Sequence, residues 1–204
     1  MWQALLLPLG IRFNGKGVKG VIRNGDVKLH ISKVTANGSF SWSTIIDGVE
    51  SCVTNEANVI YMSVTSLDAV DSFQDAITDA YNSGMLIFAP SGNDGRYTHY
   101  EYPAAFDNVV SVASVNESKT RSFFFSTAND RVNIAAPGDG ILTTHTNGGY
   151  LKYSGTSMAC AHAAGVAALV WSTYPSLSHE QLVNILERTA EDLPEDSPNG
   201  YDNY

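Results

Sequence analysis

The stretch of sequence that decides the fold is residues 58–89, NVIYMSVTSLDAVDSFQDAITDAYNSGMLIFA. Its two ends, 58–64 and 85–89, are short runs rich in apolar residues, which predict two buried strands. Between them, residues 68–83 repeat apolar side chains at helical spacing, and Gly84 provides a stop for the helix. A strand, a helix and a second strand in succession predict a parallel pair of strands joined by a crossover helix.

The alternation of strand and helix patterns continues on both sides of this unit. Upstream, residues 26–34 alternate apolar and polar side chains as a strand does, and residues 41–56 carry an apolar stripe at helical spacing. Downstream, the pattern predicts strands at 109–115 and 132–136, a glycine-rich connection with a hairpin at 138–149, a helix at 156–174, and a last helix from a capping box at 178–181 through 189. The fold class that we predict is α/β, with three layers, helix/sheet/helix, around a mainly parallel sheet.

The composition is that of one globular domain with an acidic surface. The chain has 204 residues, 12 Lys and Arg against 21 Asp and Glu, a net charge of -9, and 44% hydrophobic residues. Because an excess of negative charge repels phosphate backbones, a nucleic-acid-binding function is excluded as the default. Two cysteines, Cys52 and Cys160, are too few for a disulfide framework, and we expect free thiols.

Residues 1–12 form an apolar leader that we set apart from a domain at 13–204. The leader is shorter than the ~18 to 20 residues that a membrane span needs, so no membrane span is predicted. It also lacks the basic start and the small-residue cleavage site of a secretory signal peptide. We interpret it as a buried leader or one without a defined structure.

Two short motifs carry the chemistry. The first is Tyr-Ser-Gly-Thr-Ser-Met-Ala at 153–159, which runs into a predicted helix of small residues. A serine at a helix start is by itself an ordinary N-cap, but Gly155 lets the backbone turn sharply ahead of Ser157, and the free N–H groups of the helix favour negative charge. The second motif is Ala-Pro-Ser-Gly-Asn-Asp-Gly at 89–95, at the end of a predicted strand, which on its own describes a turn.

These motifs resemble those of the subtilisin-like serine peptidases. In that family the nucleophile lies in Gly-Thr-Ser-Met-Ala, and a strand ending in Gly-Asn supplies the amide that donates to the oxyanion. The resemblance covers roughly residues 14–200 and implies a subtilisin-like fold and proteolysis through an acyl-enzyme. It implies that Ser157 is the catalytic nucleophile and that Asn93 is the catalytic oxyanion donor.

Weaker matches extend the resemblance to the substrate site. Glu-Tyr-Pro-Ala at 101–104 resembles the family's pocket wall, Ala-Ala-Pro-Gly at 135–138 its Ala-Pro-Gly turn, and Tyr-Met-Ser-Val at 61–64 the edge along which an extended peptide adds as a strand. The substrate-binding residues that the resemblance implies are Ser63, Val64, Thr65, Gly92 and Glu101. Thr65 stands where the family usually has glycine, which would narrow the mouth of the pocket. Glu101 would lie at the base of the pocket for the side chain before the scissile bond, where a carboxylate favours Lys or Arg over Glu.

A structural calcium site is also implied, while no cofactor is required for the chemistry. Residues 14–18, Asn-Gly-Lys-Gly-Val, resemble the family's calcium loop, which would use the Asn14 side chain and the carbonyls of Lys16 and Val18. The same glycines and lysines equally describe a solvent loop, and a carboxylate ligand upstream has no counterpart in this sequence.

The family order of Asp, then His, then Ser is incomplete in this sequence. The Asp-Ser/Thr-Gly and His-Gly-x-His signatures should precede Asn14, and neither is present. His162 lies five residues after Ser157 in the same predicted helix, at an offset that points away from it, and the other four histidines lie in a strand, loops and a cap. We therefore expect the carboxyl-terminal two thirds of a serine endopeptidase domain, catalytically incomplete as given.

Several alternatives stay open. The missing motifs fit either a truncated gene product or a genuine pseudopeptidase, and a non-catalytic peptide-binding module would keep the edge at 63–65 without chemistry. A nucleotide-binding doubly wound domain needs a glycine-rich turn after its first strand, which residues 35–38 do not provide. The partners expected are a peptide or protein substrate and the missing amino-terminal segment, and a secreted location is suggested by the resemblance alone.

Overall fold

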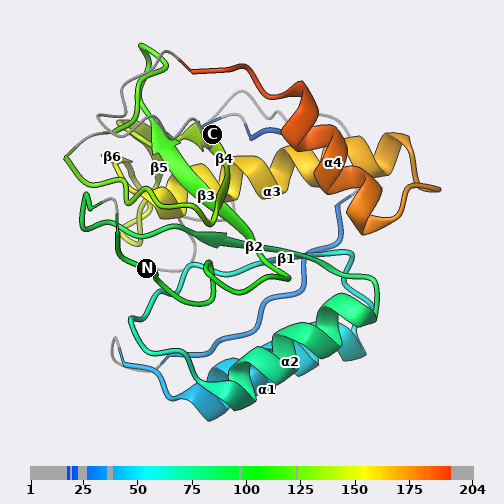
Figure 1. The fold of residues 1–204 in the computed structure, drawn as a ribbon. Coiled ribbons are helices and arrows are strands. Elements are labelled where there is room, and N and C mark those ends of the chain that lie inside the picture. Colours follow the sequence, from blue (N-terminus) through cyan, green and yellow to red (C-terminus); the bar gives the residue numbers. More distant parts are fainter. Residues whose placement is uncertain are drawn as a thin grey trace.

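The computed structural model describes residues 18, 20–22, 27–35, 39–96, 98–122 and 124–193. Within them, a four-stranded sheet in the order β1-β2-β3-β4 is covered by helices on both faces (Figure 1). All neighbouring strands of this sheet are parallel. The predicted three-layer α/β fold is therefore confirmed. The strands are β1 (Val59–Tyr61), β2 (Leu86–Pro90), β3 (Val110–Val115) and β4 (Val132–Pro137).

Within the described residues, helices pack against both faces of the sheet (Figure 1). On one face are α1 (Trp42–Thr54) and α2 (Asp71–Asn82), and on the other are α3 (Thr156–Thr173) and α4 (His179–Thr189). A hairpin is present, as the antiparallel pair β5 (Ile141–Thr144) and β6 (Tyr150–Tyr153). Its second strand lies beyond the predicted range of 138–149. The predicted capping box opens α4, where the Ser178 hydroxyl accepts from the Gln181 N–H and the Gln181 side chain accepts from the Ser178 N–H.

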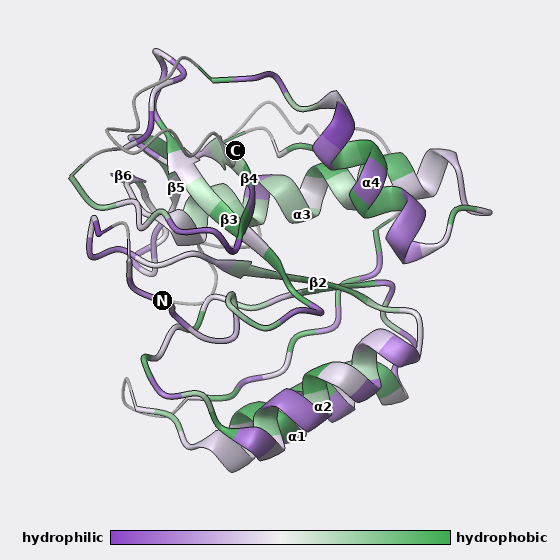
Figure 2. Cartoon of the chain, in the orientation of Figure 1, coloured by the Kyte–Doolittle hydropathy of each residue, from purple (hydrophilic) through white to green (hydrophobic). Residues whose placement is uncertain are grey.

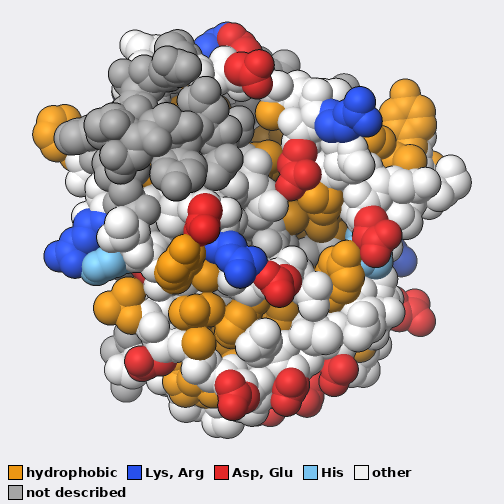
Figure 3. Space-filling view, viewed as in Figure 1, with side chains coloured by type: hydrophobic (Ala, Val, Ile, Leu, Met, Phe, Trp, Pro, Cys, Tyr) orange, Lys and Arg blue, Asp and Glu red, His pale blue; other side chains and the backbone are white. Residues whose placement is uncertain are grey.

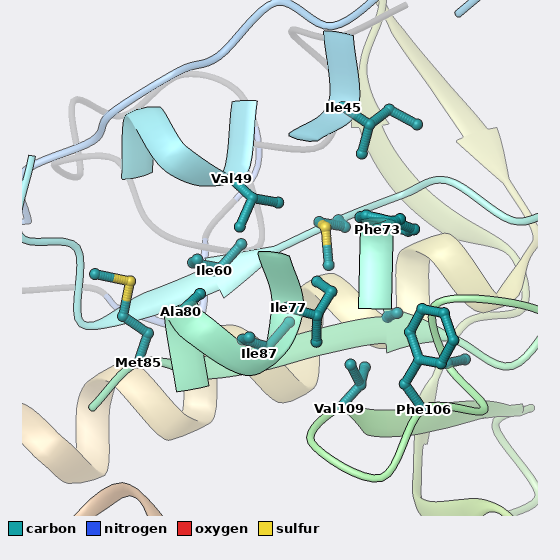
Figure 4. Close-up of a cluster of buried hydrophobic side chains, with 13 residues drawn as sticks. Ile45, Val49, Ile60, Phe73, Ile77, Ala80, Met85, Ile87, Phe106 and Val109 are labelled. Atoms are coloured by element: carbon teal, nitrogen blue, oxygen red, sulfur yellow. The ribbon is translucent and has the colours of Figure 1, made fainter. Parts of the chain in front are cut away.

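Side-chain alternation along β2 divides the core into two clusters. Ile87 and Ala89 belong to the cluster under α1 and α2, whereas Leu86 and Phe88 belong to the cluster under α3 and α4. All five residues of β2 are buried, because helices cover the sheet on both sides. Figure 4 shows the first cluster, in which Ile77 of α2 lies next to Ile87.

Polar residues lie on the outward sides of α2 and α4. In Figure 2, α2 and α4 carry hydrophilic residues beside hydrophobic ones, as expected of helices with one face in water. Asp71, Asp75 and Asp79 are exposed along α2, and Figure 3 shows acidic side chains along the side that α1 and α2 form. No helix in the described ranges is long and apolar enough to cross a bilayer.

Helix α3 owes its position to small residues. Its buried residues include Ala159, Cys160, Ala163, Ala164 and Ala167, and small side chains let a helix lie close to a sheet. The amino terminus of α3 consequently lies beside the segments that follow β1 and β2, with which it shares hydrogen bonds. Cys160 and Cys52 are both free thiols, as predicted.

The prediction of a strand over residues 26–34 is wrong for the part of it that the structure describes. Residues 27–35 are in no strand, and Val27, Leu29 and Ile31 are 40%, 48% and 60% exposed. Alternating side chains indicate a strand only where a neighbouring strand accepts its hydrogen bonds, and no described strand pairs with this segment. Val34, at the end of the segment, still packs against the cluster under α1 and α2.

Candidate active site

Ser157 is the second residue of α3, and its helix begins without a capping side chain of its own. The N-cap residue is Gly155, with an extended backbone and no side-chain hydrogen bond. The backbone N–H of Thr156 donates instead to Asn93 Oδ1, at 2.9 Å, from the loop after β2. The Thr156 hydroxyl lies 3.0 Å from the same oxygen and 3.1 Å from the carbonyl oxygen of Gly92. The two motifs that the sequence singled out are thus hydrogen-bonded to each other.

These contacts determine the orientation of the Asn93 amide. An N–H donor requires an acceptor, so the amide oxygen faces Thr156 and the amide nitrogen does not. No group in the described part of the chain accepts a hydrogen bond from Asn93 Nδ2. An amide N–H held in one orientation, next to the residue that precedes Ser157, is suited to stabilise a negatively charged oxygen.

The carboxyl end of β1 contacts Ser157 directly. The Ser63 hydroxyl donates to Ser157 Oγ at 2.7 Å, and the Tyr61 hydroxyl donates to the Ser157 carbonyl oxygen at 3.0 Å. Ser63 therefore contacts the predicted nucleophile itself, in addition to lying on the predicted substrate edge. The contact of Tyr61 was not predicted, because no sequence pattern shows that a strand residue reaches a backbone group 96 positions away.

Glu101 and Gly92 pack against each other. Glu101 is 9% exposed, and a Cβ built on Gly92 would lie 1.9 Å from Glu101 Oε1. Gly92 also has a φ of +114°, so both its conformation and its space require glycine. Within the described residues, the Glu101 carboxylate has no hydrogen-bond or ion-pair partner. A carboxylate with so little water and no partner favours the arrival of a cation.

The predicted substrate edge runs beside Glu101. Ser66 and Tyr102 form an antiparallel bridge, with the Ser66 N–H donating to the Tyr102 carbonyl at 3.0 Å and the Tyr102 N–H to the Ser66 carbonyl at 2.8 Å. The bridge keeps residues 63–65, all half-buried, close to the Glu101 position. Contacts therefore connect the predicted catalytic and substrate-binding positions around the start of α3.

The loop after β2 is held at Asp94, next to Asn93. The Asp94 carboxylate accepts from the N–H of Arg96 at 3.0 Å and from the Thr127 hydroxyl at 2.7 Å, and it lies 2.7 Å from His99 Nδ1. Burial acts to raise the pKa of Asp94, but these hydrogen bonds and His99 outweigh it and lower the pKa. The carboxylate therefore stays ionised and keeps the loop in place at neutral pH.

The Ala-Pro-Gly motif, expected as a turn, forms the end of strand β4 and the residue after it, and it packs against the start of α3. The Gly155 N–H donates to the Gly138 carbonyl at 2.8 Å. A Cβ on Gly138 would lie 2.4 Å from Ser114 Oγ and 2.7 Å from the carbonyl oxygen of Gly155. Position 138 therefore needs glycine because of this close approach, which positions Gly155, the residue before Thr156.

None of the five histidines, all of which the structure describes, hydrogen-bonds to Ser157. His162 Nδ1 lies 2.9 Å from the carbonyl oxygen of Met158 in its own helix, as its offset from Ser157 suggested. The others contact different partners: His30 contacts Ser51, His99 contacts Asp94, His145 stacks on Tyr153 and His179 lies edge-on to Tyr81. No histidine of this chain is in place to act as the general base.

The predicted calcium ligands cannot be placed together. Asn14 and Lys16 lie outside the described residues, and Val18 alone is described there. Among the described residues there is no group of three or more His, Cys, Asp or Glu that could hold a metal ion. A calcium site at 14, 16 and 18 stays a prediction.

Comparison with known proteins decides the family. A model of the subtilase family matches residues 10–203. The chain belongs to the subtilase family. Its similarity to a thermostable alkaline protease of Halalkalibacterium halodurans is 37% identity over 93% of the chain and 51% of the relative. Subtilisin DY of Bacillus licheniformis is also 37% identical, over 88% of the chain and 66% of the relative.

Solved structures agree with this membership. A protease structure from Pseudoalteromonas arctica has a TM-score of 0.87 and 28% identity, over 94% of the subtilase chain described here and 64% of that structure. The subtilisin-like fold that the sequence implied is therefore confirmed. The chain spans 51% and 66% of the lengths of the two curated relatives.

Proposed function

We propose that this chain provides the nucleophile and the oxyanion donor of a subtilase endopeptidase, with Ser157 acylated by the substrate and Asn93 stabilising the oxyanion. The observation that carries the proposal is the hydrogen bond from the Thr156 N–H to Asn93 Oδ1. It commits the amide oxygen, so that the amide N–H group is held available at a fixed place near Ser157.

The reaction follows from these positions. Ser157 Oγ attacks the scissile carbonyl carbon and loses its proton to a general base, and the carbonyl oxygen becomes an oxyanion. Asn93 Nδ2 donates to that oxyanion, together with a backbone N–H from the first turn of α3, where N–H groups lack helical acceptors. The protonated base returns its proton to the leaving nitrogen, so that collapse of the intermediate expels the amine and leaves an acyl-enzyme on Ser157, which water then hydrolyses.

The general base and its carboxylate are proposed to come from sequence outside these 204 residues. The contacts of the five histidines support this, since each is engaged away from Ser157. The substrate is a protein or peptide that lies extended along Ser63, Val64 and Thr65, with the side chain before the scissile bond entering beside Gly92 and Glu101. A secreted location and a structural calcium ion complete the proposal.

A pseudopeptidase that binds peptides without cleaving them is the second candidate. It is favoured by one observation, that no histidine of the chain contacts Ser157 while the substrate edge is intact. Once a base is supplied, the endopeptidase would cleave a bound peptide, whereas the pseudopeptidase would not.

Labelling with a fluorophosphonate probe tests the proposal. We expect the 204-residue chain to label slowly, because a serine without its base is a weak nucleophile. Removing the base lowers kcat by a factor on the order of 10^6, a magnitude that is taken from subtilisin itself. The protein that includes the upstream Asp and His motifs should label rapidly at Ser157, and Ser157→Ala should not label. Rapid labelling of the short chain would mean that it has a base of its own, and no labelling of the long protein would favour the pseudopeptidase.

The role of Asn93 has a separate test. In the complete enzyme, Asn93→Ala should lower kcat by roughly 10^2 to 10^3 with little change in KM, again the magnitude known from subtilisin. Asn82→Ala, which removes an exposed amide at the end of α2, is the matched control and should leave both constants unchanged. Equal activity of Asn93→Ala and the parent would reduce the loop at 92–94 to a structural turn.

A further inference from the structure

Strand β1 and the residues after it contact Ser157 at two separate points. Tyr61 and Ser63 are two positions apart in extended chain, so their side chains share one side of it. The Ser63 hydroxyl reaches the Ser157 side chain, while the Tyr61 hydroxyl reaches the Ser157 backbone at its carbonyl oxygen. One segment therefore holds both the reacting oxygen and the backbone that carries it.

The start of α3 needs such support from outside the helix. Gly155, the N-cap, contributes no side chain, and glycine restricts the backbone least of all residues. Thr156 is held by Asn93 and Gly92 from the loop after β2. Tyr61 is the corresponding donor for the next residue, Ser157. The first turn is thus held residue by residue from two adjacent strands.

The surroundings of Tyr61 keep its hydroxyl a donor. Its ring packs against the cluster under α3, to which Val59 and Cys160 also belong. Burial, with a contribution from Cys160, raises the pKa of Tyr61 well above its usual value, while the neighbouring Ser63 side chain acts to lower it. The phenol therefore stays protonated throughout the pH range in which a peptidase of this family would be assayed.

We propose that Tyr61 is a positioning residue, whose hydrogen bond to the Ser157 carbonyl fixes the first turn of α3 and so sets Ser157 Oγ relative to the Asn93 amide. The inference rests on the proposed function for its kinetic consequence but not for the contact itself. Tyr61 touches neither substrate nor reacting atoms, so its loss should reduce acylation without changing substrate binding.

The kinetic test is Tyr61→Phe in the complete enzyme, which keeps the ring and removes only the hydroxyl. We expect kcat and the labelling rate of Ser157 to fall roughly 2- to 12-fold, the worth of one ordinary hydrogen bond, with KM unchanged. Tyr174→Phe removes an exposed hydroxyl near the end of α3 and should change nothing. A rise in KM with unchanged kcat, or no change at all, would overturn the proposal.

A double-mutant cycle separates Tyr61 from its neighbour. If Tyr61 acts through the Ser157 carbonyl, Tyr61→Phe should lower the labelling rate by a similar factor in the Ser63→Ala background. If it acts only by orienting the Ser63 hydroxyl, its effect should vanish in that background, which would overturn the proposal.

The contact can be tested without any activity. Met158 is the only methionine in the sequence that follows a serine, so labelling serine carbonyls with carbon-13 and methionine amides with nitrogen-15 gives one Ser157–Met158 correlation. In the 204-residue chain, Tyr61→Phe should move the Ser157 carbonyl resonance upfield, and Tyr174→Phe should not. An unmoved resonance would refute the contact. A moved resonance in the 204-residue chain, together with no labelling of the protein that includes the upstream Asp and His motifs, would refute only the proposed function.

Discussion

Replacing Glu101 by glutamine should change which substrates the complete enzyme prefers. The substitution keeps the size and shape of the side chain and removes its charge. Because Glu101 is 9% exposed and its carboxylate has no partner within the described residues, a Lys or Arg side chain of the substrate would be its first ionic partner. Two unit charges about 4 Å apart attract each other by about 4 kcal/mol at an effective dielectric constant of ~20.

Part of that attraction is offset when water leaves the substrate cation. We expect a net preference of roughly 1 to 3 kcal/mol for Lys over an uncharged side chain, which is about a 5- to 140-fold ratio of kcat/KM. Glu101→Gln should remove this ratio and should also improve cleavage after Glu, because the like-charge repulsion disappears.

The assay compares kcat/KM for three matched peptides that have Lys, Phe or Glu before the scissile bond. Glu117→Gln is the matched control, since it makes the same change of charge at an exposed loop residue. If the order of the three substrates is the same in the parent and in Glu101→Gln, the carboxylate does not face the substrate and the argument fails.

Three further predictions concern stability. The pKa of Asp94 is lowered in the folded state, so its ionised carboxylate stabilises the fold at pH values above the unfolded-state pKa of about 3.9. This contribution disappears as the pH falls through the folded-state pKa. Asp94→Asn should thus lower Tm by about 2–4 °C at pH 7, with the difference closing below about pH 4 in thermal melts; a constant difference would contradict the assignment. Gly138→Ala should lower the free energy of unfolding in urea by about 1–3 kcal/mol, because its Cβ would overlap Ser114 and Gly155; an unchanged midpoint would disprove the close approach. Chelation of calcium should lower Tm if the loop at 14–18 binds it, and identical melts with calcium and with a chelator would remove that site.

Most of the fold could be predicted from the sequence, because a strand that helices cover on both faces is a continuous run of apolar residues. Residues 85–89 are apolar without interruption, and β2 is indeed covered on both faces. Residues 26–34 show the limit of the same reasoning, since alternation describes a strand only when another strand lies beside it. A local pattern contains no information about that neighbour.

The site was predictable to the extent that it is written in contiguous motifs. Ser157 and Asn93 each lie in a short motif, so the sequence could propose them as candidates, and the structure joins the two motifs through Thr156. Tyr61 could not be found in this way, because its importance depends on which backbone oxygen its hydroxyl reaches. Whether the hydroxyl reaches that oxygen depends on how closely α3 packs on β1, which is a property of the assembled core.

The cap of α3 has a consequence for the newly made chain. The residue that caps the helix, Asn93, lies 63 positions before Thr156, and Tyr61 lies 96 positions before Ser157. In a chain whose strands and helix have formed but have not yet packed together, Thr156 and Ser157 lack these two contacts. The contacts around Ser157 therefore form together with the finished core, so a chain that is newly made, or partly unfolded, has Ser157 without the neighbours that position it.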